Sequence, residues 1–261
     1  MMRFLSGLPL ARRLSLALGV TQTLAWATTY YIPAVMAGAA AESLGWSRTA
    51  LLGGFSWSLI VAALCAPPIG RFIDRAGGRP ILAAGAIVTC AGLLLLAASN
   101  GLAWWYVAWT VLGVGMAMGL YDTSFATIGR LLGQGARPAI LGVTLMAGFA
   151  GTIGWPVGTW LVQQYGWRVA LCLFAALQVA VILPIILALV PPAGPAPPPA
   201  PPRRADAGGP TPALAFALLA VFFTSRAAIS SLVSVHLLVL LGGIGLTTAQ
   251  AVFTAAMIGP A

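Results

Sequence analysis

Two charged side chains within long apolar runs are best placed to do chemistry in this sequence. Arg226 stands about 13 residues into such a run, with Ser230 four residues later on the same helical face. A fixed cation there would attract an anionic solute such as a carboxylate, although a salt bridge to another helix is equally consistent with the sequence. Asp122 is the only acid inside a predicted span. It could carry a coupling proton, but we favour a structural pairing with an arginine such as Arg130.

The first long apolar run carries a polar and aromatic stripe. Its members recur at helical spacings and are Gln22, Trp26, Thr29, Tyr30 and Pro33. Lipid offers no hydrogen bonds, so such a stripe faces either a cavity or a partner helix, and the sequence leaves both open. The lone histidine, His236, is expected near the end of its helix at the membrane surface rather than in a proton relay.

Composition excludes soluble proteins, enzymes and nucleic-acid binders. Hydrophobic residues make up 60% of the chain and charged residues 7%, with a mean hydropathy of +0.99, which indicates a polytopic membrane protein. The net charge of +9 comes from arginines scattered over short loops rather than gathered in a patch. One histidine, three isolated cysteines and no phosphate-binding loop predict no enzyme, no cofactor and no metal site.

The apolar runs predict six spanning helices before a break in composition. Residues 191–212 hold ten of the 19 prolines, which favours an extended linker and excludes a membrane helix. We therefore expect a six-helix bundle in residues 1–190, a proline-rich cytoplasmic linker in 191–212, and the start of a second bundle in 213–261. The expected helices cover residues 14–37, 49–69, 81–98, 103–128, 139–162, 169–190, 213–241 and, in part, 246–261.

The arginines predict the orientation in the membrane. If the amino terminus is cytoplasmic, ten of the 13 lie inside, two lie outside and one lies within a helix. The positive-inside rule then places the amino terminus in the cytoplasm of an inner (plasma) membrane protein. The first apolar run is too long for the core of a signal peptide, so we expect an uncleaved helix.

A charged segment, GRFIDRAGGRP at residues 70–80, predicts a tight turn between the second and third helices. Its spacing resembles the cytoplasmic loop signature between helices 2 and 3 of major facilitator superfamily transporters. The resemblance implies that Asp74, Arg75 and Arg79 clamp the cytoplasmic side of the two halves when the carrier faces outward. Gly70 and Gly77 would allow the close approach and the turn. The alternative is that the arginines only anchor the topology and that Asp74 caps a helix.

The resemblance extends over the whole chain. It implies an all-α membrane protein with the major facilitator fold, a six-helix N-terminal bundle plus the beginning of the C-terminal bundle, working by alternating access. Four shorter features resemble the monocarboxylate-porter and oxalate/formate-antiporter branch: LGWSR at 44–48, YDTSFA at 121–126, YGWR at 165–168 and the proline in helix 5. That branch implies secondary active transport of a small solute, with a proton-linked monocarboxylate or another organic anion as the solute.

Two alternatives remain open. A drug-efflux carrier is the first, although its helix 5 typically carries a denser glycine and proline pattern than this chain does. The family has twelve helices, so the second alternative is a transport-incompetent truncated fragment, or a bundle that depends on a partner for the missing C-terminal half. The DNA immediately downstream would discriminate between an incomplete and a complete chain.

Overall fold

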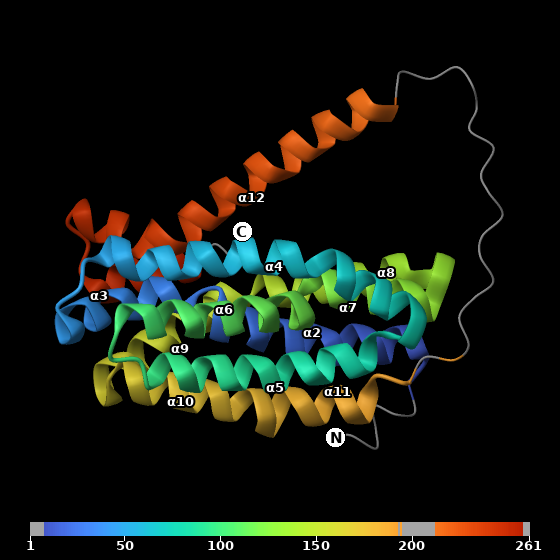
Figure 1. Cartoon of the computed structure of the whole chain (residues 1–261), viewed down its shortest axis with the longest axis horizontal. Coiled ribbons are helices and arrows are strands. Elements are labelled where there is room, and N and C mark those ends of the chain that lie inside the picture. The colour runs from blue at the N-terminus through green and yellow to red at the C-terminus, as the bar shows by residue number, and fades with distance from the viewer. Residues whose placement is uncertain (1–7, 193, 195–211, 258–261) are drawn as a thin grey trace.

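The computed structural model describes residues 8–192, 194 and 212–257. Helices joined by short connections make up almost all of this part, and no strand occurs in it, which confirms the predicted all-α class (Figure 1). The elements are α2 (Leu10–Thr29), α3 (Ile32–Leu44), α4 (Arg48–Ala76), α5 (Gly78–Ala97), α6 (Leu102–Gly119), α7 (Tyr121–Leu132), η1 (Gly133–Gly135), α8 (Ala136–Gly148), α9 (Ala150–Tyr165), α10 (Trp167–Leu177), η2 (Gln178–Ile182), α11 (Leu183–Leu189), α12 (Pro212–Gly243) and α13 (Thr248–Ala256).

Several helical segments are long and apolar enough to cross a membrane. Five such segments occur in the described residues, and the longest covers residues 102–165. A straight helix of its 64 residues would be about 96 Å long, far more than a bilayer needs, so this segment must cross twice. It folds back at η1, where Gly133 has a φ of 54° that favours glycine. The chain is therefore a multi-pass membrane protein.

The first span is longer than predicted and is broken in its middle. It consists of α2 and α3, which meet at Tyr30 and Tyr31, so helix continues well beyond both ends of the expected 14–37. Charged residues such as Arg12 and Glu42 mark its ends without terminating it, because long polar side chains can reach the membrane surface from a helix. Gly45, with a φ of 70°, ends α3.

The predicted turn at residues 70–80 is wrong in its extent. Helix α4 continues through Pro67 and Pro68 to Ala76, and the single residue Gly77 separates it from α5. Proline is tolerated inside membrane helices because neighbouring groups satisfy the carbonyls that it frees. Gly77 makes the whole reversal with a φ of 85° and a ψ of 165°, a conformation that side-chain-bearing residues rarely adopt.

Two apolar clusters fill the bundle, one towards each end. Trp105, Trp109 and Phe55 dominate the cluster at the end where Gly45 connects the spans, which we call the Gly45 end. The other cluster, around Leu14 and Ile128, lies at the opposite end, which we call the Gly77 end. These side chains fix how the spans pack, and so position the polar groups between them.

Replacing Gly113 by alanine is expected to lower the free energy of unfolding by about 1–3 kcal/mol. A Cβ at this position of α6 would lie 2.5 Å from the backbone oxygen of Ser58 on α4. Backbone cannot move aside without shifting a whole helix. Thermal unfolding in detergent measures the effect, with Gly119→Ala as the control on the same helix, since a Cβ there has nothing within 4 Å. Equal unfolding temperatures for the two variants would contradict this packing.

The last two helices only partly join the bundle. The end of α12 lies against α3, and α13 lies against α9, whereas α12 slants away from the other helices towards its start (Figure 1). Residues 213–230 of α12 are accordingly exposed. The predicted linker at 191–212 falls mostly on residues 193 and 195–211, and the end of the predicted eighth helix falls on 258–261, all outside the described residues.

Candidate functional site

Gln22, on α2 of the first span, bonds to the break between α6 and α7, which together form the fourth span. Its amide Nε2 donates to the carbonyl oxygen of Gly119 and to Oγ of Ser124, each at 2.7 Å. The Gly119 carbonyl is free because the helix breaks at Leu120, where α6 ends and α7 begins. The buried Oε1 of Gln22 has no hydrogen-bond partner in the described part of the protein. This acceptor is therefore available to a water molecule or a solute.

Replacing Gln22 by methionine is expected to lower the free energy of unfolding by about 1–3 kcal/mol. The side chain keeps a similar length, but the partly buried carbonyl of Gly119 and the buried hydroxyl of Ser124 lose their donor. Thermal unfolding in detergent measures this, with Thr144→Val as the control because the hydroxyl of Thr144 bonds only within its own helix and is exposed. Unchanged stability of Gln22→Met would show that the amide contributes little to joining the two spans.

An aromatic face continues from Gln22 along the same side of the first span. We define it as Trp26, Tyr30, Tyr121 and Phe125. The Trp26 ring lies 4.7 Å from that of Tyr30 and 4.9 Å from that of Tyr121, and Tyr121 stacks on Phe125 at 4.9 Å. The indole Nε1 of Trp26 is buried and has no partner in the described residues. The structure thus brings three predicted residues of the stripe together with two aromatic residues of α7.

The predicted stripe is divided in the structure. Thr29 is 3% exposed and donates to the carbonyl of Ala25, so it faces the interior of the bundle instead of the aromatic face. Pro33 lines a separate cavity at the Gly45 end. Thr29 precedes Tyr30 by one residue, which rotates it about 100° around the helix. Residues spaced three and four apart can still differ in direction around the helix. The sequence therefore could not show that Thr29 faces away from Tyr30.

A buried polar contact at the sixth span is absent from the sequence predictions. Nε2 of Gln178 donates to Oγ1 of Thr28 at 2.9 Å, at the start of the π-helical turn η2. The cavity beside this contact has a volume of about 10 Å³, which is room for one water molecule. The sequence signal for this contact was Gln178 itself, a polar residue inside the apolar run at 169–190.

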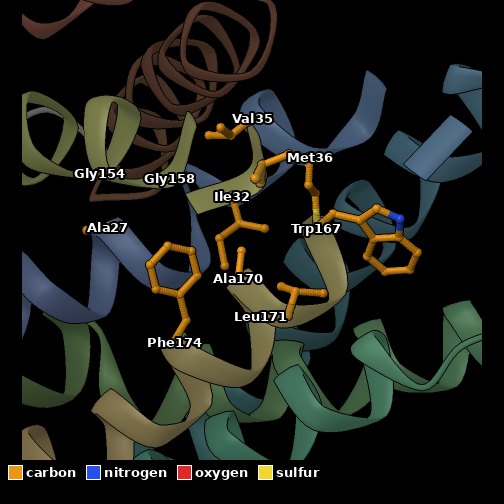
Figure 2. Close-up of a pocket in the computed structure, with 11 residues that line it drawn as sticks. Ala27, Ile32, Val35, Met36, Gly154, Gly158, Trp167, Ala170, Leu171 and Phe174 are labelled. Atoms are coloured by element: carbon orange, nitrogen blue, oxygen red, sulfur yellow. The ribbon is translucent and has the colours of Figure 1, made fainter. Parts of the chain in front are cut away.

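Another cavity, with a volume of about 10 Å³, lies between α3, α9 and α10. Figure 2 shows the side chains that line it. Its walls are apolar, with Ile32, Met36 and Phe174 projecting into it and the glycines Gly154 and Gly158 on one side. The volume is too small for an organic solute, and no polar side chain could orient one. It is a packing defect rather than a candidate site.

The charged motif makes its contacts within the first bundle. Arg130 of α7 donates to the backbone carbonyls of Asp74 and Arg75 at the end of α4, and Arg79 donates to the carbonyl of Leu187 on α11. Cations at helix C-termini stabilise the free carbonyls there. The side chains of Asp74 and Arg75 themselves are exposed.

Asp122 does not pair with Arg130 in the structure, contrary to the pairing that the sequence favoured. Arg130 is engaged with the carbonyls of α4, and Asp122 is exposed in the first turn of α7. A carboxylate at that position is stabilised by the positive end of the helix dipole. The break at Leu120 created this helix start, and a continuous fourth helix would have had none.

Arg226 and Ser230 lie side by side on the exposed part of α12. Together with Phe222, Ser225 and Ile229 they line an open depression on this helix. Ser234, eight residues after Arg226, is buried because it lies towards the end of α12 that packs against α3. In the described residues, α12 alone lines this depression, so Arg226 is not in contact with Gln22 or the aromatic face.

The fold and these sites define a helical membrane protein whose broken spans gather polar groups in the membrane interior. The sequence matches the family model of the Major Facilitator Superfamily over residues 17–261, and the chain therefore belongs to this superfamily. A search of curated proteins found no match.

Two solved structures are similar in fold. The first is a bacterial homolog of the human lysosomal transporter Spinster, in an inward-facing and unoccupied conformation, with 17% identity and a TM-score of 0.67 over 96% of this chain and 60% of that one. The second is tetrameric PepTSo2, with 14% identity and a TM-score of 0.54 over 86% of this chain and 49% of that one. This chain thus spans less than two thirds of either protein.

Proposed function

We propose that this chain forms part of a secondary active carrier that moves a small solute across the membrane by alternating access. The observation that carries the proposal is the aromatic face beside Gln22, where two buried polar atoms without partners lie between the first and fourth spans. Lipid-facing surfaces do not keep such atoms, whereas a solute path uses them to orient its cargo. Membership of a superfamily of transporters favours a carrier over an enzyme.

The solute in this proposal is a monocarboxylate or another small organic anion, carried with protons. Arg226 supplies the cation for the carboxylate, with Ser230 beside it as a donor. Asp122, at the start of α7, is the candidate group for the coupled proton. The resemblance to the monocarboxylate-porter and oxalate/formate-antiporter branch supports this solute class.

The charged motif is the cytoplasmic gate in this proposal. Asp74 and Arg75 are exposed at the Gly77 end, where they are free to contact a second bundle. Arg79 holds α11 in place, and Gly70 and Gly77 allow the close approach. The corresponding domain plan is a bundle in 1–190, a linker in 191–212 and a second bundle beginning at 213, with the amino terminus in the cytoplasm of an inner membrane.

Uptake of labelled lactate and formate into proteoliposomes under an imposed pH gradient tests this function. The chain is compared with a version extended by the downstream reading frame. We expect the extended form to take up the labelled solute. This uptake should increase with the size of an inward-directed proton gradient and should stop when the gradient is collapsed. Uptake by neither form would overturn the carboxylate assignment, and uptake of cationic drugs instead would support the efflux alternative.

A further inference from the structure

A cavity large enough for a small molecule lies at the Gly45 end of the described part of the protein. It has a volume of about 710 Å³, is lined by α3, α4, α9, α12 and α13, and is open to the outside, where its lining residues Glu42, Arg48 and His236 are exposed. Cavities of roughly 300–1,000 Å³ are typical of sites for small molecules. No residue of the aromatic face lines it, so it is separate from the site described above.

Opposite charges from different helices meet in the lining of this cavity. Glu42 comes from α3 and Arg48 from α4, with His236 from α12. A guanidinium nitrogen of Arg48 lies 3.0 Å from the position that a Cβ on Gly38 would take, so the arginine side chain lies close over α3. The side chains of Glu42 and Arg48 are both exposed, so solvent reaches the two charges. The lining therefore presents one anion and one cation that a bound solute can contact.

Uncharged polar groups and aliphatic walls complete the lining. Thr159 of α9 lines the cavity with a buried hydroxyl that has no hydrogen-bond partner in the described residues. An unpartnered buried hydroxyl is a polar group still requiring a ligand or a water molecule. Most other lining residues are aliphatic, among them Val35, Leu52, Val162 and Val239.

We propose that this cavity binds a small zwitterion with an aliphatic side chain, of the size and charge of a neutral amino acid. Its carboxylate pairs with Arg48, its ammonium group pairs with Glu42, and its side chain packs on the aliphatic wall. A solute with only a negative charge would leave Glu42 unpaired and would be repelled by it. A solute with only a positive charge meets the same penalty at Arg48. This site does not depend on the carrier function proposed above.

Three matched ligands distinguish the charge classes by isothermal titration calorimetry. The purified full chain in lipid nanodiscs is titrated with L-leucine, with its 2-hydroxy acid analogue and with L-leucinamide. These ligands share the side chain and are a zwitterion, an anion and a cation. At about pH 6.5, where the α-amino group of L-leucinamide is largely protonated, we expect L-leucine to bind at least about tenfold more tightly than either analogue.

Single substitutions at the two charges should change the preference in opposite directions. Glu42→Gln removes the repulsion of anions, so the affinity for the 2-hydroxy acid should rise relative to that for L-leucine. Arg48→Gln should favour L-leucinamide in the same way. Thr159→Val should weaken all three ligands, and Arg137→Gln on α8, an exposed arginine outside the lining, should change none.

Three results would overturn the proposal. They are equal binding of L-leucine and its hydroxy acid by the unmodified chain, no binding of L-leucine at all, and binding that survives both Glu42→Gln and Arg48→Gln. Correct folding of each variant is checked by its unfolding temperature, so a lost signal is not mistaken for a misfolded protein. Failure here leaves the uptake experiment unaffected, since that experiment depends on Arg226.

Discussion

Replacing Arg226 by glutamine is expected to reduce carboxylate uptake at least about 100-fold. In the proposed carrier this guanidinium is the fixed charge that pairs with the anionic solute, and loss of one partner of a charge-assisted pair typically has effects of this size. Glutamine retains hydrogen-bond donors and has a similar length, so a loss of uptake in this variant is due to the missing positive charge. The measurement is the initial rate of labelled lactate uptake into proteoliposomes by the extended form of the chain.

Two matched variants make the Arg226 result interpretable. Arg137→Gln removes an exposed arginine of α8 and should leave uptake unchanged. Ser230→Ala, beside Arg226 in the same depression, should lower uptake by only about tenfold, because a neutral hydroxyl contributes less than a full charge. Normal uptake by Arg226→Gln would exclude this arginine as the solute cation.

Replacing Arg130 by alanine is expected to lower the free energy of unfolding by about 1–3 kcal/mol and to loosen the end of α4. The guanidinium bonds to the carbonyls of Asp74 and Arg75, which end α4 immediately before the one-residue reversal at Gly77. Without it those carbonyls lose their charged partner and the last turn of α4 can fray. Hydrogen exchange at residues 70–77 and thermal unfolding measure the two effects.

Arg130→Lys should restore part of the stability, since one ammonium group can reach one carbonyl but cannot bridge two. Arg137→Ala, the neighbouring arginine on the same end of the bundle, should leave the exchange at 70–77 unchanged. If residues 70–77 exchange as fast in the lysine variant as in the alanine variant, the planar guanidinium of arginine, rather than its charge alone, is the essential feature. Unchanged exchange in Arg130→Ala would contradict the proposed role of Arg130 at this helix end.

The long apolar helices could be predicted because each apolar run is long and bounded by charge or glycine. Only one of the two helix breaks inside spans left a signal in the sequence. Pro33 has no N–H to bond the carbonyl of Thr29, which favours the break at Tyr30 and Tyr31. Nothing in the local sequence at Leu120 forbids a helix, and that break persists because a tertiary partner, Gln22, satisfies the freed carbonyl of Gly119. Conversely, Pro67 and Pro68 signalled an end to α4 that the folded bundle overrides.

The candidate site was predicted only in part for the same reason. Periodicity placed Gln22, Trp26 and Tyr30 on one side of a helix, and the structure brings them together with α7. Which residues of other spans they would meet depended on the break at Leu120. The charged lining at the Gly45 end joins Glu42, Arg48 and His236, which the sequence separates by up to 194 residues. Glu42 and Arg48 are only six residues apart, on either side of Gly45, but no local pattern could have added His236 to them.

Thiol labelling tests most directly whether the aromatic face lines a solute path. The three native cysteines are replaced by serine, and single cysteines are introduced at Trp26, Tyr30 and Tyr121, with Leu64 as a control that is 72% exposed on the outside of α4. A small, charged methanethiosulfonate reagent reacts only where water reaches the thiol. We expect the three positions of the aromatic face to react at least about tenfold faster than position 64, which lipid covers. Equal or slower reaction at these positions would contradict a solute path along the first and fourth spans.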